Sequence, residues 1–231
     1  MDGPLAEAGG GFIRSRGMKF PKHPDFIKGK VRRLLRTNAY EQKEADAALR
    51  IVKKGDVVIE LGGGIGYMST LVASKRAIKS VHSFEANPNL IPYIQSVHAA
   101  NNVTNAHVTN AILGARKGKV DFYLRDPMLG SSMDLIEGEE TPPSTKVDVL
   151  NAKTVFKDIK PNVLICDIEG AEVDLIPKLD LTGLRAAIIE THPQWIGPEG
   201  MDKVMRAFMD AGLAYYHRGS HGKVLCFRTE W

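Results

Sequence analysis

Short apolar runs alternate with segments of helical spacing along most of the chain. In a segment such as 40–53, apolar residues recur every three or four positions, which indicates an amphipathic helix. Repeated strand–helix alternation of this kind predicts a parallel sheet with helices on both faces. The pattern predicts strands at Val57–Leu61, Ser80–Phe84, Ala106–Leu113, Lys119–Leu124, Val163–Ile168 and Leu184–Glu190, and helices at Tyr40–Lys53, Tyr67–Lys75, Pro88–Ala100 and near 171–178 and 200–211.

The end of the chain departs from this alternation. Two further strand patterns, Leu213–His217 and Lys223–Phe227, are separated by only a few residues around Gly219–Gly222. So short a link cannot hold a crossover helix, and we therefore expect an antiparallel pair. Residues 126–146 are polar and rich in Pro and Gly, which predicts a loop or flap. The expected class is α/β, with a mostly parallel sheet that ends in an antiparallel C-terminal hairpin.

Composition narrows the class of protein. The 231 residues are 43% hydrophobic and 25% charged, which is typical of a globular domain. There is no apolar run long enough to span a bilayer, and the first residues lack the apolar core of a secretory signal, so we expect a cytoplasmic protein. Both cysteines, Cys166 and Cys226, lie in apolar strand-like runs, which favours buried, reduced thiols over a disulfide or a metal site.

The positive charge is concentrated at the N-terminus. The first 54 residues hold 13 of the 31 Lys and Arg residues but only 6 of the 27 Asp and Glu residues. Most of this basic excess lies within Lys19–Arg36. Residues 1–17 are Gly-rich, and we expect them to be mobile. We interpret residues 1–39 as a basic arm or cap, and 40–231 as the catalytic domain. A solvated arm is favoured over a handle for an anionic partner, and nucleic acid is an unlikely partner, because no interleaved aromatic residues accompany the charge.

A glycine-rich turn between a strand and a helix predicts a nucleoside site. Gly62, Gly64 and Gly66 follow a G-x-G-x-G pattern, which lets a ligand approach the backbone closely. Tyr67 breaks the dinucleotide G-x-G-x-x-G spacing. Glu85 ends the next strand, where a carboxylate can accept both hydroxyl groups of a ribose. After the third strand, Asn110 and the amide of Ala111 could meet an adenine edge, although Asn110 also suits a simple turn.

These motifs resemble those of class I S-adenosylmethionine-dependent methyltransferases, and more narrowly of the FkbM family. "YE" at 40–41, "GDVVIELGGGIGYMS", "FEANPNL", "NAILG", "CDIEGAE" and "IIETH" occur in the order of that family, and "DxEGAE" is its most specific element. The resemblance covers about residues 40–190. It implies a Rossmann-like, doubly wound, seven-stranded sheet, S-adenosylmethionine bound at Glu60, the three glycines and Glu85, and O-methylation. The chain departs from the family where Glu60 replaces a frequent Asp and where Gly63-Gly64-Ile65 replaces an "AN" pair.

Two strand ends carry the candidate catalytic residues. Asp167 and Glu169 are two residues apart, as are Glu190 and His192 on the following strand, so each pair should point to one side. We predict that all four line one pocket beside the methyl group. His192 is the predicted general base, since an imidazole with an ordinary pKa near ~6.5 is largely neutral at pH 7. Asp167 should lie near the sulfonium, and Glu169 should orient the acceptor.

Two further acids and a metal alternative complete this prediction. Glu172 and Asp174 fall in the first turn of the next helix, where acids favour the helix dipole, so they are assigned a structural role. No metal is predicted. The alternative is that the three carboxylates and the imidazole hold Mg²⁺ or Mn²⁺.

The predicted activity is S-adenosylmethionine-dependent O-methylation of a hydroxyl on a small molecule, such as a sugar or polyketide-like acceptor. The alternatives are a nicotinamide-dependent oxidoreductase, which the glycine spacing and the terminal hairpin disfavour, and a cofactor-binding protein without turnover. A nucleic-acid methyltransferase would be expected to show an Asn-Pro-Pro-aromatic motif, and "CDIEGAE" stands in its place. We expect Lys19–Arg36 and residues 126–146 to close over the substrate. The sequence leaves homo-oligomerisation open.

Overall fold

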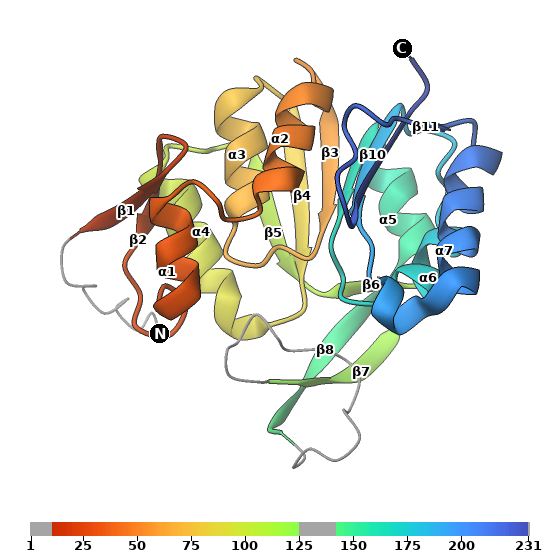
Figure 1. Ribbon diagram of the computed structural model, residues 1–231. Helices are drawn as coiled ribbons and strands as arrows, with labels where there is room; N and C mark the ends of the chain where they lie inside the picture. Colours follow the sequence, from red (N-terminus) through yellow and green to blue (C-terminus); the bar gives the residue numbers. More distant parts are fainter. Residues whose placement is uncertain (1–10, 125–141, 231) are drawn as a thin grey trace.

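A seven-stranded sheet forms the centre of the molecule in the computed structural model, which describes residues 11–124 and 142–230 (Figure 1). Its strand order is β11-β12-β10-β9-β3-β4-β5. The five strands from β10 to β5 are parallel, whereas β12 is antiparallel to both β10 and β11. This confirms the predicted mostly parallel sheet and its antiparallel end. The strands are β3 (Val57–Leu61), β4 (Ser80–Glu85), β5 (Ala106–Asn110), β9 (Val163–Cys166), β10 (Ala186–Glu190), β11 (Ala214–Tyr215) and β12 (Val224–Arg228).

Helices cover both faces of this sheet. They are α2 (Gln42–Ile51), α3 (Tyr67–Lys75), α4 (Ile91–Ala100), α5 (Ala152–Ile159), α6 (Glu172–Leu175) and α7 (Pro193–Asp210), whereas α1 (Gly29–Arg36) lies beside the N-terminal hairpin (Figure 1). Val58 packs in the core cluster that contains residues of α2, α3 and α4, while its neighbour Ile59 packs in the cluster that contains Phe156 of α5 and Phe208 of α7. Adjacent strand residues thus point into opposite layers, as the two-residue period of a strand requires. The described residues contain no helix long and apolar enough to cross a membrane.

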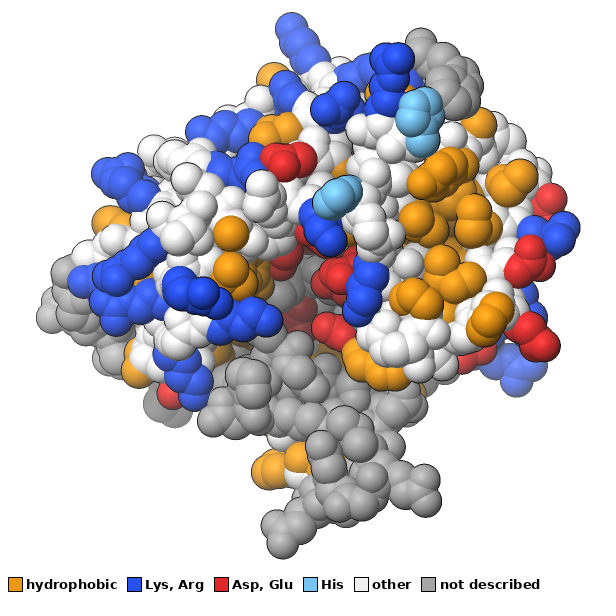
Figure 2. Space-filling view, viewed as in Figure 1, with side chains coloured by type: hydrophobic (Ala, Val, Ile, Leu, Met, Phe, Trp, Pro, Cys, Tyr) orange, Lys and Arg blue, Asp and Glu red, His pale blue; other side chains and the backbone are white. Residues whose placement is uncertain are grey.

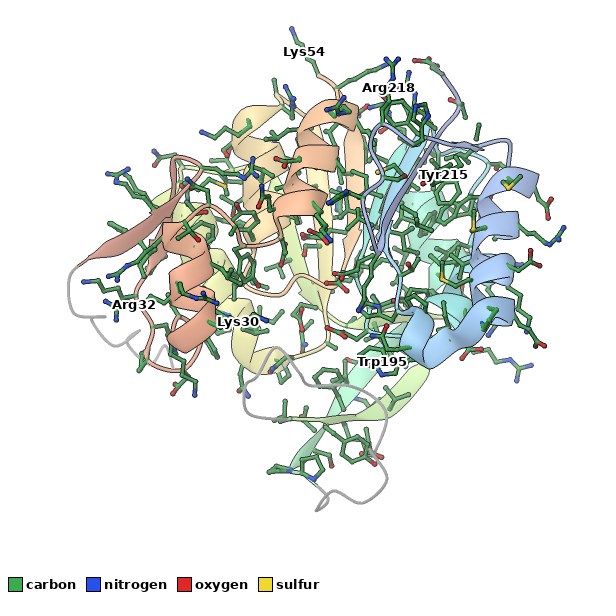
Figure 3. All side chains as sticks on the ribbon, viewed as in Figure 1. Lys30, Arg32, Lys54, Trp195, Tyr215 and Arg218 are labelled. Carbon is green, nitrogen blue, oxygen red and sulfur yellow. The ribbon has the colours of Figure 1, made fainter. Side chains whose placement is uncertain are left out.

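The N-terminal segment differs from the expected mobile tail. Strands β1 (Phe12–Ser15) and β2 (Met18–Pro21) form an antiparallel hairpin. Met18 and Phe20 are buried in the core cluster of α2, α3 and α4, and the Phe20 ring stacks on Tyr67 at a centroid distance of 5.4 Å. The apolar residues of the hairpin stand among the basic and Gly-rich positions of this part of the chain, so the composition concealed a segment that tertiary contacts order. Basic side chains such as Lys30 and Arg32 project from α1 beside the hairpin (Figure 3).

A second, three-stranded sheet also departs from expectation. The predicted strand Ala106–Leu113 ends at Asn110, and β6 (Ile112–Gly114) pairs instead with β8 (Ser144–Asn151), which also pairs with β7 (Gly118–Tyr123). The predicted loop at 126–146 lies mostly outside the described residues, but its last residues belong to β8. The sequence prediction also missed α5 and β8. Few positions of β8 are buried, so its apolar signal is weak.

A buried ion pair links three parallel strands at the end of the sheet where these strands begin. Arg185 donates two hydrogen bonds to the Asp56 carboxylate, which also accepts from the Lys53 amide at 2.6 Å and from Asn162 Nδ2 at 3.1 Å. The Asp56 side chain is almost fully buried. These contacts link the segment before β3 to those before β9 and β10, so they fix the start of three neighbouring strands.

Replacing Asp56 with alanine should lower the free energy of unfolding by about 3–5 kcal/mol, because it leaves the Arg185 charge half-buried without its partner. Urea unfolding followed by circular dichroism measures this loss. Asp202→Asn removes the exposed Asp202–Arg206 pair and should change the midpoint little. Equal midpoints for the two variants would contradict a structural role for Asp56.

Candidate active site

A cavity of about 350 Å³ opens where the parallel strands β3, β4 and β9 end. This is the edge of an open α/β sheet at which ligands bind. Its walls include Glu41, Gly62, Gly64, Glu85, Ala111 and Asp167. In the space-filling view, acidic side chains gather in a hollow near the middle of the molecule (Figure 2). The cavity is large enough for a small-molecule cofactor.

The glycine loop at residues 62–66 forms one wall of the cavity, and its backbone conformation requires glycine. Gly62 has a φ of +89°, and a Cβ at this position would overlap the carbonyl oxygen of Asp167. Gly64 has a φ of +51° and open space where a side chain would lie. Gly66 immediately precedes α3 and lies close to Ile94. Gly62 and Gly64 line the cavity, whereas Gly66 shapes the turn behind it.

Glu85 presents a fixed carboxylate to the cavity. Its Oε2 accepts a hydrogen bond from the Gly64 amide at 2.8 Å, and its Oε1 accepts one from the Asn87 amide at 2.7 Å. Burial raises the pKa of Glu85, while these hydrogen bonds oppose the rise. The carboxylate lies in the cavity wall at the end of β4, so its placement suits the predicted ribose contact.

Two predicted cofactor residues take supporting positions. Glu60 is buried behind the loop, where its Oε1 accepts from the Ser69 amide at 3.0 Å, and burial raises its pKa to about 7. Asn110 donates from Nδ2 to the carbonyl oxygens of Glu85 and Ala86, each at 2.9 Å. Neither side chain belongs to the cavity wall, although Ala111, next to Asn110, does.

The fold brings the four predicted residues together, but only Asp167 and Glu169 belong to the cavity wall, whereas Glu190 and His192 do not. Strands β9 and β10 are adjacent and parallel, so their ends carry Asp167 and Glu169 close to Glu190 and His192. His192 Nε2 lies 3.8 Å from Asp167 Oδ1 and 3.5 Å from Glu169 Oε2. One ligand atom each of Asp167, Glu190 and His192 lies within 4.8 Å of the other two. Burial, followed by the charges of Glu190 and Glu169, raises the pKa of Asp167 to about 8.

Glu172 has a second role that the sequence did not reveal. It lies in the first turn of α6, as predicted, but its side chain is fully buried and accepts a hydrogen bond from His192 Nδ1 at 2.7 Å. Burial works to lower the pKa of His192, but this bond and the charges of Glu172, Glu169 and Asp167 raise it overall. The imidazole therefore holds its proton to higher pH than a free histidine, which alters the premise on which it was predicted to be the base.

Two more side chains at the site were missed by the sequence prediction. Trp195, at the start of α7, stacks on the His192 ring at a centroid distance of 4.9 Å and is 59% exposed (Figure 3). Glu41, in the "YE" pair, lines the cavity, and burial raises its pKa well above the ordinary value. The only sequence signals were a tryptophan shortly after "ETH" and the place of "YE" in the family pattern.

Comparison with solved structures supports the same fold. A Pyrococcus horikoshii protein assigned to the transferases aligns over 93% of this chain and 70% of its own, with a TM-score of 0.54 and 15% identity. Trm5b from Pyrococcus abyssi aligns over 94% of this chain and 55% of its own, with a TM-score of 0.51 and 14% identity. P. horikoshii TYW2, solved with MeSAdo, aligns over 92% and 67%, with a TM-score of 0.50 and 14% identity.

A family match identifies the activity class. A comparison with curated protein sequences gave no match. The Methyltransferase FkbM domain, however, matches residues 60–219, a range that contains the glycine loop, Glu85 and the Asp167–His192 cluster. This match excludes the nicotinamide-dependent alternative. The chain belongs to the FkbM methyltransferase family and is an enzyme that uses S-adenosylmethionine.

Proposed function

We propose that this methyltransferase acts on a hydroxyl group of a small molecule, such as a sugar or polyketide-like acceptor. The observation that carries the proposal is the group of Asp167, Glu169, Glu190 and His192, of which Asp167 and Glu169 line the cavity where β9 ends. An aliphatic hydroxyl must lose its proton as it is methylated, and this group supplies several atoms that can receive one. The resemblance of the sequence motifs to the FkbM family also implies O-methylation.

The cavity suits the cofactor at its other end. Glu85 would accept the ribose hydroxyls, Gly62 and Gly64 would let the cofactor approach the backbone, and Ala111 would lie against the adenine. The Ala111 amide itself donates to the Glu85 carbonyl oxygen at 3.2 Å, so the predicted amide contact with the adenine edge is not available in this structure. The open space at Gly64 and the carboxylate of Glu85 support this placement. Glu60, Gly66 and Asn110 would act on the cofactor indirectly, by holding the loop and the end of β4 in place.

The three proposed catalytic residues, Asp167, Glu169 and His192, would each have a different role. When bound, S-adenosylmethionine supplies an activated methyl group. Asp167 would lie near the sulfonium charge, and Glu169 would orient the acceptor. The acceptor oxygen would receive that methyl group, and the cluster that contains His192 would receive the hydroxyl proton.

Glu85→Ala should weaken binding of S-adenosylhomocysteine by about 1.5–3 kcal/mol, since it removes hydrogen bonds to a charged group. Isothermal titration calorimetry measures the change. Asp158→Asn, an exposed substitution on α5, is the control and should bind like the wild type. Unchanged affinity in a folded Glu85→Ala protein would rule out the ribose placement.

A screen with methyl-labelled S-adenosylmethionine tests the reaction itself. The acceptor panel holds sugars, polyketides and phenols, with RNA and DNA as comparisons. We expect label on an oxygen of a small molecule, located by mass spectrometry and NMR. Label transferred only to nitrogen, to carbon or to nucleic acid would overturn the proposal of O-methylation.

A further inference from the structure

The cluster beside the cavity combines four carboxyl groups with one imidazole. Asp167, Glu169, Glu172 and Glu190 lie around His192, and the ion pairs of the first three all involve that one ring. One imidazole cannot satisfy four carboxyl groups. We propose that Asp167, Glu190 and His192 bind a divalent cation, of which Mn²⁺ is the best-matched example.

The geometry of His192 is the first independent support. Its side chain is only 5% exposed, and Glu172 holds Nδ1. Nε2 points toward Asp167 and Glu169 and has no hydrogen-bond partner among the described residues. Histidine ligands of metals typically donate the other ring N–H to a carboxylate, which fixes the ring and directs the free nitrogen at the ion. Glu172 has that position here.

Asp167 supplies the second support. Its Oδ1 is a buried oxygen without a hydrogen-bond partner among the described residues, and it lies 3.8 Å from His192 Nε2. That separation is too long for the short hydrogen bond of a charged pair. Two atoms that each lie about 2.0–2.2 Å from one ion are roughly 3–4 Å apart, so the gap fits a shared cation. A small rotation of the partly exposed Glu190 side chain would complete the set.

The ligand types indicate which cation fits. Two carboxylates and one imidazole suit Mn²⁺ or Zn²⁺ better than Ca²⁺ or Mg²⁺, which prefer oxygen ligands alone. This inference deepens the proposed function, because a hydroxyl oxygen bound to such a cation loses its proton more readily. His192 Nε2 would then be a ligand, and Glu169 would remain free to accept the proton.

Mn²⁺ binding to the metal-stripped full-length protein tests the site without any acceptor. Electron paramagnetic resonance follows the loss of the free Mn²⁺ signal. We expect one bound ion in the wild type and at least tenfold weaker binding in His192→Asn and Glu190→Gln. Asp202→Asn, an exposed substitution on α7, should bind like the wild type. Asparagine at 192 can still donate to Glu172, so the fold should be retained, and thermal unfolding checks this.

Two outcomes would overturn the cation site. One is a wild-type protein that leaves excess Mn²⁺ free, and the other is equal binding in all four proteins. Activity separates this inference from the proposed function. An enzyme that binds no Mn²⁺ and O-methylates fully after chelation would refute the cation and leave O-methylation standing. A protein that binds Mn²⁺ through these residues but methylates nitrogen would refute O-methylation and leave the cation site standing.

Discussion

His192→Ala should lower turnover by about 10²–10⁴-fold at saturating cofactor, the range typical for loss of a group that assists proton transfer. His192 provides the only imidazole of the cluster, and Glu172 fixes its ring so that Nε2 faces Asp167 and Glu169. The affinity for S-adenosylhomocysteine should stay close to that of the wild type, because the proposed ribose contact at Glu85 belongs to another strand. Steady-state kinetics with the acceptor from the screen, together with calorimetry, measure the two quantities.

The matched variant for this prediction is His192→Asn. Its amide can still donate a hydrogen bond to the buried Glu172 carboxylate, whereas alanine leaves that carboxylate with the Gly170 amide as its remaining donor. Alanine should therefore lose both stability and turnover, and asparagine mainly turnover. Near wild-type turnover of the asparagine variant across pH 6–9 would contradict a catalytic role for His192.

Gly62→Ala should be the most disruptive change in the glycine loop. The positive φ of +89° costs a non-glycine residue about 1–3 kcal/mol, and overlap of Cβ with the Asp167 carbonyl oxygen adds about 1–3 kcal/mol more. The free energy of unfolding should fall by roughly the sum of the two. Cofactor binding should weaken as well, because Gly62 and Asp167 both line the cavity.

Gly55→Ala separates the two contributions. Gly55 has a similar φ of +84°, but a Cβ there would have no neighbour within 4 Å. It should show the backbone cost alone and leave cofactor affinity unchanged. Urea unfolding and calorimetry on both variants measure this. A Gly62→Ala protein no less stable than Gly55→Ala would mean that the loop can move away from Asp167.

Much of the fold was predictable because its signals are local. The central strands are buried on both faces, so β3, β9 and β10 appear as apolar runs, and the short link before β12 admits only an antiparallel turn. The hairpin β1–β2 and strand β8 were not predictable in this way. Their order depends on contacts with distant segments, such as Phe20 with Tyr67 and β8 with β7.

The candidate site likewise has features that local sequence predicts and features that depend on tertiary contacts. The sequence by itself determined that Asp167, Glu169, Glu190 and His192 leave strand ends in pairs, because side-chain alternation is a property of the strand. It also determined where backbone without Cβ is needed at Gly62 and Gly64.

Only the tertiary structure decided which of these residues act together. The adjacency of β9 and β10 places Asp167 near His192, 25 residues further along the chain, and the burial of Glu172 makes it the partner of that histidine. The same structure moved Glu60 and Asn110 from the cavity wall to supporting positions, since their side chains bond to the backbone behind it. Hydrogen-bond partners, burial and the resulting pKa values depend on distances between strands, and these are set when the sheet assembles, not by local sequence.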